Sequence, residues 1–269
     1  MAGLPVYDQG ASDLCYAYSN SQLIDAWRRS HGVPDGPLTS AVANGIEMNG
    51  ENGGNVMPSY GIFREHGACS AGSIDAFIAT AAPGKGVANP YRMFERASAA
   101  ACPDRTEAQE RNACGLARAC GSRIDLTAMP SMETQLNREG GMEDVRRAID
   151  ASLDAGQPAA MIYCMSALRD RNFRYFDDNN RPGVCRDGKH ASVIVGRRRV
   201  QGPGGRPRCE YLVRNSFGPC SNVEGTNYGS RCENGQFWMD VVHNAYQVFW
   251  IARGGADGAR PQSSTAARP

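Results

Sequence analysis

A turn runs into an apolar helix at Gln9-Gly10-Ala11-Ser12-Asp13-Leu14-Cys15-Tyr16-Ala17-Tyr18-Ser19. Ser12 or Asp13 is a suitable N-cap, and the apolar side chains that follow keep helical spacing until Gly32: Tyr16, Leu23, Ile24 and Trp27. Cys15 would lie in the first turn, where unpaired backbone N–H groups and the positive end of the helix dipole favour a thiolate. Because the thiolate is the reactive form of cysteine, this segment predicts a nucleophile. The alternative is a buried, inert side chain, which is the commoner fate of a lone cysteine.

A thiol nucleophile needs a general base, and the chain has four histidines. Three of them are explained by helix ends or by a polar turn: His31, His66 and His243. His190 instead opens a β-patterned segment at 191–195, and the end of a strand holds an imidazole rigidly. Asn215 follows another such segment, 210–214, and its amide oxygen can accept a hydrogen bond from the imidazole and fix the ring. Taken alone, Asn215 is better explained as an ordinary residue at the end of a strand.

Helical patterns dominate the first half of the chain and β patterns the second. We expect further helices over 38–48, with Thr39 or Ser40 as the N-cap, over 57–66 and over 142–156. Short segments rich in β-branched and aromatic residues predict strands at 159–165, 191–195, 210–214, 236–240 and 247–252. Residues 98–128 hold three cysteines and are expected to form a disulfide-pinned insertion. Helices followed by antiparallel strands indicate the α+β class.

The composition describes a folded chain with almost no net charge. Of its 269 residues 41% are hydrophobic, and the formal net charge is +1. A bulk positive field is therefore missing, which argues against nucleic acid as a partner. The longest apolar runs, such as 159–165, fall far short of the ~18 residues that cross a membrane. The first residues carry neither the basic nor the apolar part of a signal peptide, so either the chain stays where it is made or its leader is missing.

Four separated segments of the chain resemble the papain-like cysteine peptidases. Residues 9–19 match the family's Q-G-x-x-x-x-C-[WY]-A-[FY]-S, and residues 189–196 resemble its H-A-[VS]-x-x-V-G strand. Residues 211–218 resemble [YW]-x-[IVL]-[KR]-N-S-W-G, and residues 233–237 resemble E-N-G-[YF]-[FI]. The resemblance implies a two-lobed α+β fold, with a helical lobe, an antiparallel β-barrel-like lobe and the active-site cleft between them.

The resemblance also implies how the chain is divided. We expect a single catalytic domain at 1–252, with a helical lobe at about 10–128 that includes the insertion. A β-rich lobe is expected at about 129–252, followed by a disordered tail at 253–269 that is rich in Gly, Ala, Ser, Pro and Arg.

Single residues receive roles from the same resemblance. Cys15 is the nucleophile paired with His190, Asn215 orients His190, and Gln9 with the backbone N–H of Cys15 holds the oxyanion. The positions expected to contact substrate or to shape its site are Asn52, Gly53, Gly54, Asp13, Lys189 and Phe217. Three of these depart from the family pattern: Asp13 stands beside the nucleophile, Phe217 replaces a shielding Trp, and Lys189 replaces an Asp.

Besides Cys15 there are nine cysteines, which we expect to form four disulfides with one thiol left over. Cys220–Cys232 is the expected pair within an insert, and Cys164, in an apolar strand, is the expected free thiol. The spacing of the others lacks the tight pairs of a zinc site, so no metal and no cofactor are expected. Disulfides indicate an oxidising compartment, and basic residues that are almost all arginine indicate a GC-rich bacterial genome. Together they predict a secreted or periplasmic bacterial protein.

The leading hypothesis is a cysteine endopeptidase that hydrolyses peptide bonds through a thioester acyl-enzyme. A papain-fold bacterial effector that deamidates or transamidates glutamine side chains is the first alternative, and release of ammonia without new peptide termini would identify it. A catalytically inactive binding homologue is the second, and failure of Cys15 to react with an epoxysuccinyl reagent would identify it. We expect a monomer with a protein or peptide substrate, and neither a nucleic-acid nor a membrane partner.

Overall fold

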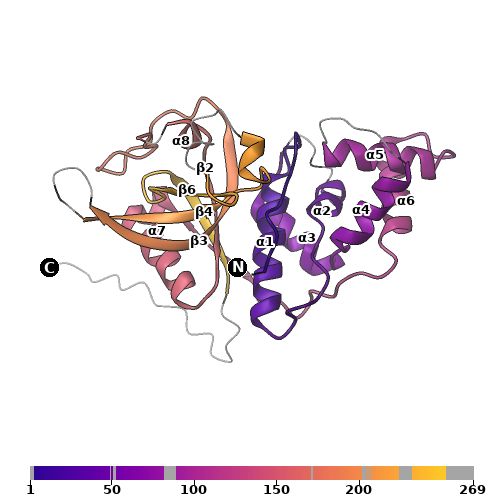
Figure 1. Cartoon of the computed structure of the whole chain (residues 1–269), viewed down its shortest axis with the longest axis horizontal. Helices are drawn as coiled ribbons and strands as arrows, with labels where there is room; N and C mark the ends of the chain where they lie inside the picture. The colour runs from indigo at the N-terminus through magenta and orange to yellow at the C-terminus, as the bar shows by residue number, and fades with distance from the viewer. Residues whose placement is uncertain are drawn as a thin grey trace.

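The computed structural model describes residues 3–48, 50, 53–81, 89–170, 172–201, 205, 207–223 and 232–252. Figure 1 shows two bodies side by side, a helical lobe of α1 to α6 and a β lobe formed by the sheet with α7 and α8. The helices are α1 (Cys15–Ser30), α2 (Ala41–Glu47), α3 (Val56–His66), α4 (Ala71–Ala81), α5 (Pro90–Ala101), α6 (Ala108–Ala119), α7 (Asn137–Asp154) and α8 (Ser166–Arg169).

The β lobe is built on one antiparallel sheet of six strands in the order β1-β6-β2-β3-β4-β5. Their bounds are β1 (Met132–Leu136), β2 (Ala159–Cys164), β3 (Lys189–Gln201), β4 (Pro207–Arg214), β5 (Gln236–Met239) and β6 (Ala245–Ile251). All five predicted strands are present, and β1 is an additional edge strand. The α+β class predicted from the sequence is confirmed.

Both faces of the central strands are buried, because alternate side chains enter two different cores. Ala160, Val193 and Phe249 pack with the helical lobe, whereas their neighbours Met161, Ile194 and Val248 pack in the core that includes α7. This explains why β2 is an almost continuous apolar run instead of an alternating one. Helix α1 packs against the first face, which brings the N-terminus of α1 to the start of β3.

The helix boundaries agree with the sequence at α2, α3 and the long part of α7, and differ at the N-terminus of α1. Ser40 caps α2 by accepting from the Ala43 N–H at 3.2 Å, as expected for one of its two candidate caps. Gly141 interrupts α7 with non-helical φ and ψ of +77° and +175°, so residues 137–140 form a separate turn and the long helix begins at Met142, as predicted. The cap prediction for α1 was wrong: Leu14 is its N-cap and makes no side-chain cap, because the Ser12 hydroxyl donates to the Gln9 carbonyl instead.

Four disulfides link eight of the ten cysteines, as predicted: Cys69–Cys120, Cys102–Cys114, Cys164–Cys185 and Cys220–Cys232. The predicted Cys220–Cys232 pair is confirmed, and Cys15 lies outside all four. The prediction of Cys164 as the other free thiol was wrong, because β2–β3 pairing brings the two ends of the 164–185 loop together. The free thiol is Cys209 on β4.

Among the described residues, no helix is both long and apolar enough to span a bilayer. The tail predicted to be disordered, 253–269, lies outside the residues that the structure describes.

Candidate active site

The N-terminus of α1 presents Cys15 with bare backbone donors around its sulfur. Because no side chain caps the helix, the N–H groups of Cys15 and Tyr16 are free to face the thiol. Together with the N–H of Ala191 on β3 they act to lower its pKa. Burial is the larger effect and, aided by the charge of Asp13, leaves the pKa of Cys15 above its ordinary value. The resting side chain is therefore a neutral thiol that already has donors placed for a developing negative charge.

His190 reaches the same place from the β lobe. It is the second residue of β3, opposite Tyr163 of β2, and it is only 4% exposed. The ring of Phe217 lies 4.8 Å from its ring, and that of Tyr163 lies 5.7 Å away, edge-on. Burial lowers the pKa of His190 to about 4, against the opposing effect of the hydrogen bond to Asn215. The imidazole is consequently neutral near pH 7 and can accept a proton.

Asn215 determines which imidazole nitrogen of His190 can accept a proton. Its Oδ1 lies 2.7 Å from Nε2 of His190 and also accepts from the Ser216 N–H at 2.8 Å and the Ser192 hydroxyl at 3.2 Å. A backbone N–H can only donate, so the side-chain atom facing it must be oxygen. Nε2 of His190 must then carry the proton, which leaves Nδ1 as the basic atom. The order Asn215–Nε2–H and free Nδ1 is what a general base needs.

Gln9 is bound into the same network from the N-terminal segment. Its backbone N–H donates to the Ser216 carbonyl at 2.7 Å, and its Oε1 accepts from the Ser216 hydroxyl at 2.6 Å. Its Nε2 donates to the Ser12 carbonyl at 2.6 Å. One of the two amide hydrogens thus has a partner among the described residues. Gln9 is buried and does not line the cavity that Cys15 and His190 share.

Cys15 and His190 share the wall of a cavity of about 610 Å³. One side of this cavity comes from the helical lobe through Tyr16, Gly54 and Val56. The other comes from the β lobe through apolar and aromatic residues that include Ile162, Tyr175, Phe176, Pro182 and Tyr246. The wall also carries Arg138, Glu139 and Lys189, so it mixes apolar and charged side chains. A nucleophile and a base on the wall of such a cavity are suited to acyl transfer to or from a bound chain.

The predicted substrate positions are distributed unevenly around this cavity. Gly54 and Lys189 line it, and the Lys189 ammonium lies 4.5 Å from the centre of the Tyr246 ring. A Cβ at Gly54 would come within 2.6 Å of the Tyr16 ring, whereas Gly53 is exposed with φ at +95°, so both positions require glycine for different reasons. Asp13 is exposed and is not part of the cavity wall, and Asn52 lies outside the described residues.

Phe217 also lies off the cavity wall and packs on His190. Its position suits shielding of the imidazole more than contact with substrate.

Sequence reasoning missed several residues that build the site. Ser192 and Ser216 bind the Asn215 amide, and Tyr163 packs on His190 while its hydroxyl reaches Ser192 at 3.1 Å. Ser192 is two residues beyond His190 on β3, so period-two alternation places both on one face and could have identified it. Nothing local identified Tyr175 and Phe176, because an irregular loop carries them.

No group of three or more His, Cys, Asp or Glu side chains that could hold a metal ion occurs among the described residues.

Comparison with known proteins identifies the fold. No family model matches the chain, and no curated protein matches its sequence. Among solved structures, SERA5E from Plasmodium falciparum superposes with a TM-score of 0.58 at 15% identity, over 93% of this chain and 90% of that one. The Carica candamarcensis cysteine protease CMS1MS2 in complex with E-64 gives 0.51 at 13% identity, over 92% of each chain.

A third neighbour contributes a longer chain. The ragweed pollen allergen Amb a 11, a cysteine protease in its proform, gives a TM-score of 0.50 at 14% identity, over 92% of this chain and 61% of that one. The neighbours are papain-like cysteine proteases, so the chain has the two-lobed papain-like fold that the motif resemblance implied.

Proposed function

We propose that the chain is a cysteine endopeptidase with Cys15 as nucleophile and His190 as base. The observation that carries the proposal is the fixed ring of His190. Its Nε2–H is held by Asn215, so the basic Nδ1 is free on a residue that shares a cavity wall with the Cys15 thiol. Both neutral forms are favoured at rest, because burial raises the pKa of Cys15 and lowers that of His190. Proton transfer from sulfur to Nδ1 then accompanies attack on the substrate carbonyl.

The remaining steps use groups already described. The carbonyl oxygen becomes an oxyanion that accepts from the Cys15 backbone N–H and from the second amide hydrogen of Gln9. His190 returns the proton to the leaving amine, and the C–N bond breaks to give a thioester on Cys15. Water then donates a proton to His190 as it attacks the thioester, the C–S bond breaks to release the acid, and His190 returns the proton to the sulfur of Cys15.

The disulfides bear on where this enzyme works. Four disulfides in a chain of this size are stable only in an oxidising compartment. We therefore propose that the protein works outside the reducing cytosol. That it is a monomer, and that a bacterium secretes or exports it, remain separate proposals from the sequence.

Selective labelling of Cys15 tests the proposal, with Cys209 as the internal control. An epoxysuccinyl peptide should modify Cys15 and block hydrolysis of a denatured protein, whereas Cys209, half-buried on β4, should remain free by mass mapping. Hydrolysis should produce new peptide termini. Ammonia release without new peptide termini would instead indicate that the enzyme acts on glutamine side chains. Absence of Cys15 labelling would indicate a catalytically inactive binding protein.

A further inference from the structure

The β-lobe side of the cavity is an aromatic wall formed by Tyr175, Phe176 and Tyr246. The rings of Tyr175 and Tyr246 lie 4.1 Å apart, and those of Phe176 and Tyr246 lie 6.2 Å apart. Tyr246 belongs to β6, so the sheet holds it. Tyr175 and Phe176 lie in a segment that, among its described residues, makes one isolated β-bridge, between Phe176 and Pro182, and belongs to no strand of the sheet. Something other than regular secondary structure must therefore place two of the three rings.

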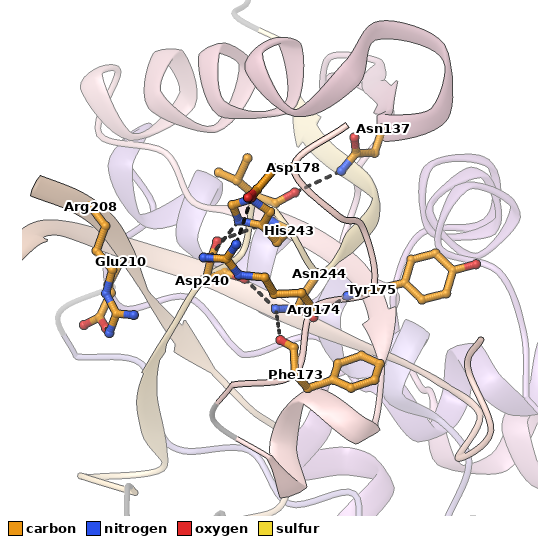
Figure 2. Close-up of polar contacts among 11 residues, drawn as sticks. Asn137, Phe173, Arg174, Tyr175, Asp178, Arg208, Glu210, Asp240, His243 and Asn244 are labelled. Atoms are coloured by element: carbon orange, nitrogen blue, oxygen red, sulfur yellow. Dashed lines mark hydrogen bonds and ion pairs between the residues drawn. The ribbon is translucent and has the colours of Figure 1, made fainter. Parts of the chain in front are cut away.

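The backbone supplies part of that restraint, since the Phe176 N–H donates to the His243 carbonyl at 2.8 Å, and the rest comes from Asn244. It lies in the turn between β5 and β6 and is only 2% exposed. Its Oδ1 accepts from the Tyr175 N–H at 3.2 Å, and its Nδ2 donates to the Phe173 carbonyl at 3.0 Å and the Asp240 carbonyl at 2.8 Å. Figure 2 shows this amide among the backbone groups of Phe173, Tyr175 and Asp240. Both amide hydrogens and the oxygen thus bind backbone atoms, so the side chain links the turn to the wall segment on both sides of Arg174.

The turn that carries Asn244 is itself fixed. Asn137, at the start of α7, donates to the Val242 carbonyl and the Ala245 carbonyl, each at 3.0 Å. The Asn137 side chain is fully buried. Because the turn is anchored to α7 and to two strands, loss of the Asn244 bonds would release the loop at residues 173–175 and leave it joined to the turn through the Phe176–His243 backbone bond.

Charged groups surround the same turn but are less suited to set the position of the wall. His243 lies between Asp240, at 2.7 Å, and Asp178, at 3.3 Å, and Arg174 contacts Asp178 at 2.9 Å. Figure 2 shows these groups beside Asn244. Asp178 is 82% exposed, and ion pairs with exposed partners contribute little. Buried hydrogen bonds to backbone atoms contribute more, because losing them leaves polar groups unpaired.

We propose that Asn244 is a positioning residue of the cavity: it fixes Tyr175 and Phe176 against Tyr246 and so determines which substrate side chain the cavity accepts. It touches neither Cys15 nor the cavity itself. The inference rests on the proposed function only in assigning the cavity to a substrate side chain.

Two substitutions of Asn244 test whether it positions the aromatic wall or is needed for the whole lobe to fold. Asn244→Ala removes all three hydrogen bonds. Asn244→Asp keeps the size and the acceptor for the Tyr175 N–H, but turns a carboxylate oxygen toward two carbonyl oxygens. Asn179→Ala is the matched control, since this exposed asparagine of the same loop uses only its backbone N–H among the described contacts.

The experiment measures Cys15 alkylation by two reagents in a Cys209→Ala background. Iodoacetamide is small and reports on the thiol alone, whereas an epoxysuccinyl peptide with a phenylalanine side chain must also fill the cavity. We expect both Asn244 variants to lower the rate ratio of the peptide reagent to iodoacetamide about tenfold, and Asn179→Ala to keep it within twofold. With a hydrolysed peptide substrate, the same variants should raise KM and leave kcat within about twofold.

An unchanged ratio in either folded variant would overturn the proposal. So would loss of the native near-ultraviolet circular dichroism signal in both variants, because it would make Asn244 a residue needed for the whole lobe to fold. The alkylation ratio is measurable even in a protein that hydrolyses nothing, so failure of the proposed function and failure of this inference give different results.

Discussion

The two sides of the candidate site are constructed differently. The helical lobe contributes a nucleophile within one short segment, with Cys15 at the bare N-terminus of α1. Gln9, six residues before Cys15, joins this segment to Ser216 of the β lobe. The β lobe contributes a base whose environment comes from three strands and the residues that follow them: Tyr163 on β2, His190 and Ser192 on β3, and Asn215 to Phe217 after β4. A side built from one segment should lose function one group at a time, whereas a cross-strand network should lose function as a unit.

Removal of the nucleophile should have the largest effect. Cys15→Ala deletes the atom that forms the acyl-enzyme, so kcat/KM should fall by on the order of 10⁴-fold or more. Cys209→Ala removes the other free thiol and should leave kcat/KM within about twofold. Both are measured with one fluorogenic peptide, and the fold is checked by circular dichroism. Equal losses in the two variants would contradict a thiol mechanism at Cys15.

Gln9→Ala should give the next largest loss on the nucleophile side. It removes one of two proposed oxyanion donors, which typically lowers kcat by about 10²-fold with little change in KM. Steady-state kinetics on the same peptide separate the two constants. A change confined to KM would make Gln9 a substrate contact instead of an oxyanion donor.

Asn215→Ala tests the network side. The nucleophile and the base both remain, but the ring of His190 loses the acceptor that fixes it, so kcat/KM should fall by about 10–10²-fold. Phe217→Ala, which uncovers the imidazole, should cost less, and the double variant should be little worse than Asn215→Ala. Additive losses would show that these residues do not serve one interaction.

The same difference in construction explains what the sequence could predict. Cys15, His190 and Asn215 each sit in a short pattern, and four such patterns in order were enough to indicate the fold. Strand β1 was not predicted, because its sequence, Met-Glu-Thr-Gln-Leu, has few apolar residues, as is typical of a partly exposed edge strand. Helices α4 to α6 were not predicted, although α5 carries a local signal: Asn89 caps it by accepting from the Arg92 N–H, and Pro90 opens its first turn. Reading the region only as a disulfide-pinned insertion passed over this signal.

The cavity wall was unpredictable for a related reason. The Tyr175 N–H is bound by Asn244 and the Phe176 N–H by the His243 carbonyl, and both partners lie about seventy residues further along the chain. No local pattern marks such a contact. Likewise the free thiol was misassigned because only strand pairing shows that Cys164 faces Cys185.

The smallest expected effect compares one buried titratable group from each lobe. In the helical lobe, burial raises the pKa of Asp25 to about 6, although Tyr7, Thr39 and Arg28 all favour its charged form. In the β lobe, burial lowers the pKa of His190 to about 4. The two shifts act on stability with opposite sign.

For Asp25, the unfolded chain loses the proton near pH 3.8 and the native state keeps it to about pH 6, so this group's contribution falls as the pH rises between those values. For His190, the unfolded chain takes up a proton near pH 6.5 and the native state only near pH 4, so its contribution is complete above pH 6.5 and is lost as the pH falls toward 4. At full effect, each of these two pKa shifts changes the free energy of unfolding by about 3 kcal/mol.

Urea denaturation of Asp25→Asn and His190→Gln at pH 4.5 and 7 separates the two effects. Relative to the wild-type protein, Asp25→Asn should gain stability on going from pH 4.5 to 7, because the group that disfavours the higher pH is gone. His190→Gln should lose stability over the same interval, because the group that favours the higher pH is gone. Equal pH dependence of stability in the two variants would mean that burial does not shift the pKa of either side chain as described. The two lobes would then not differ in how their buried groups affect stability.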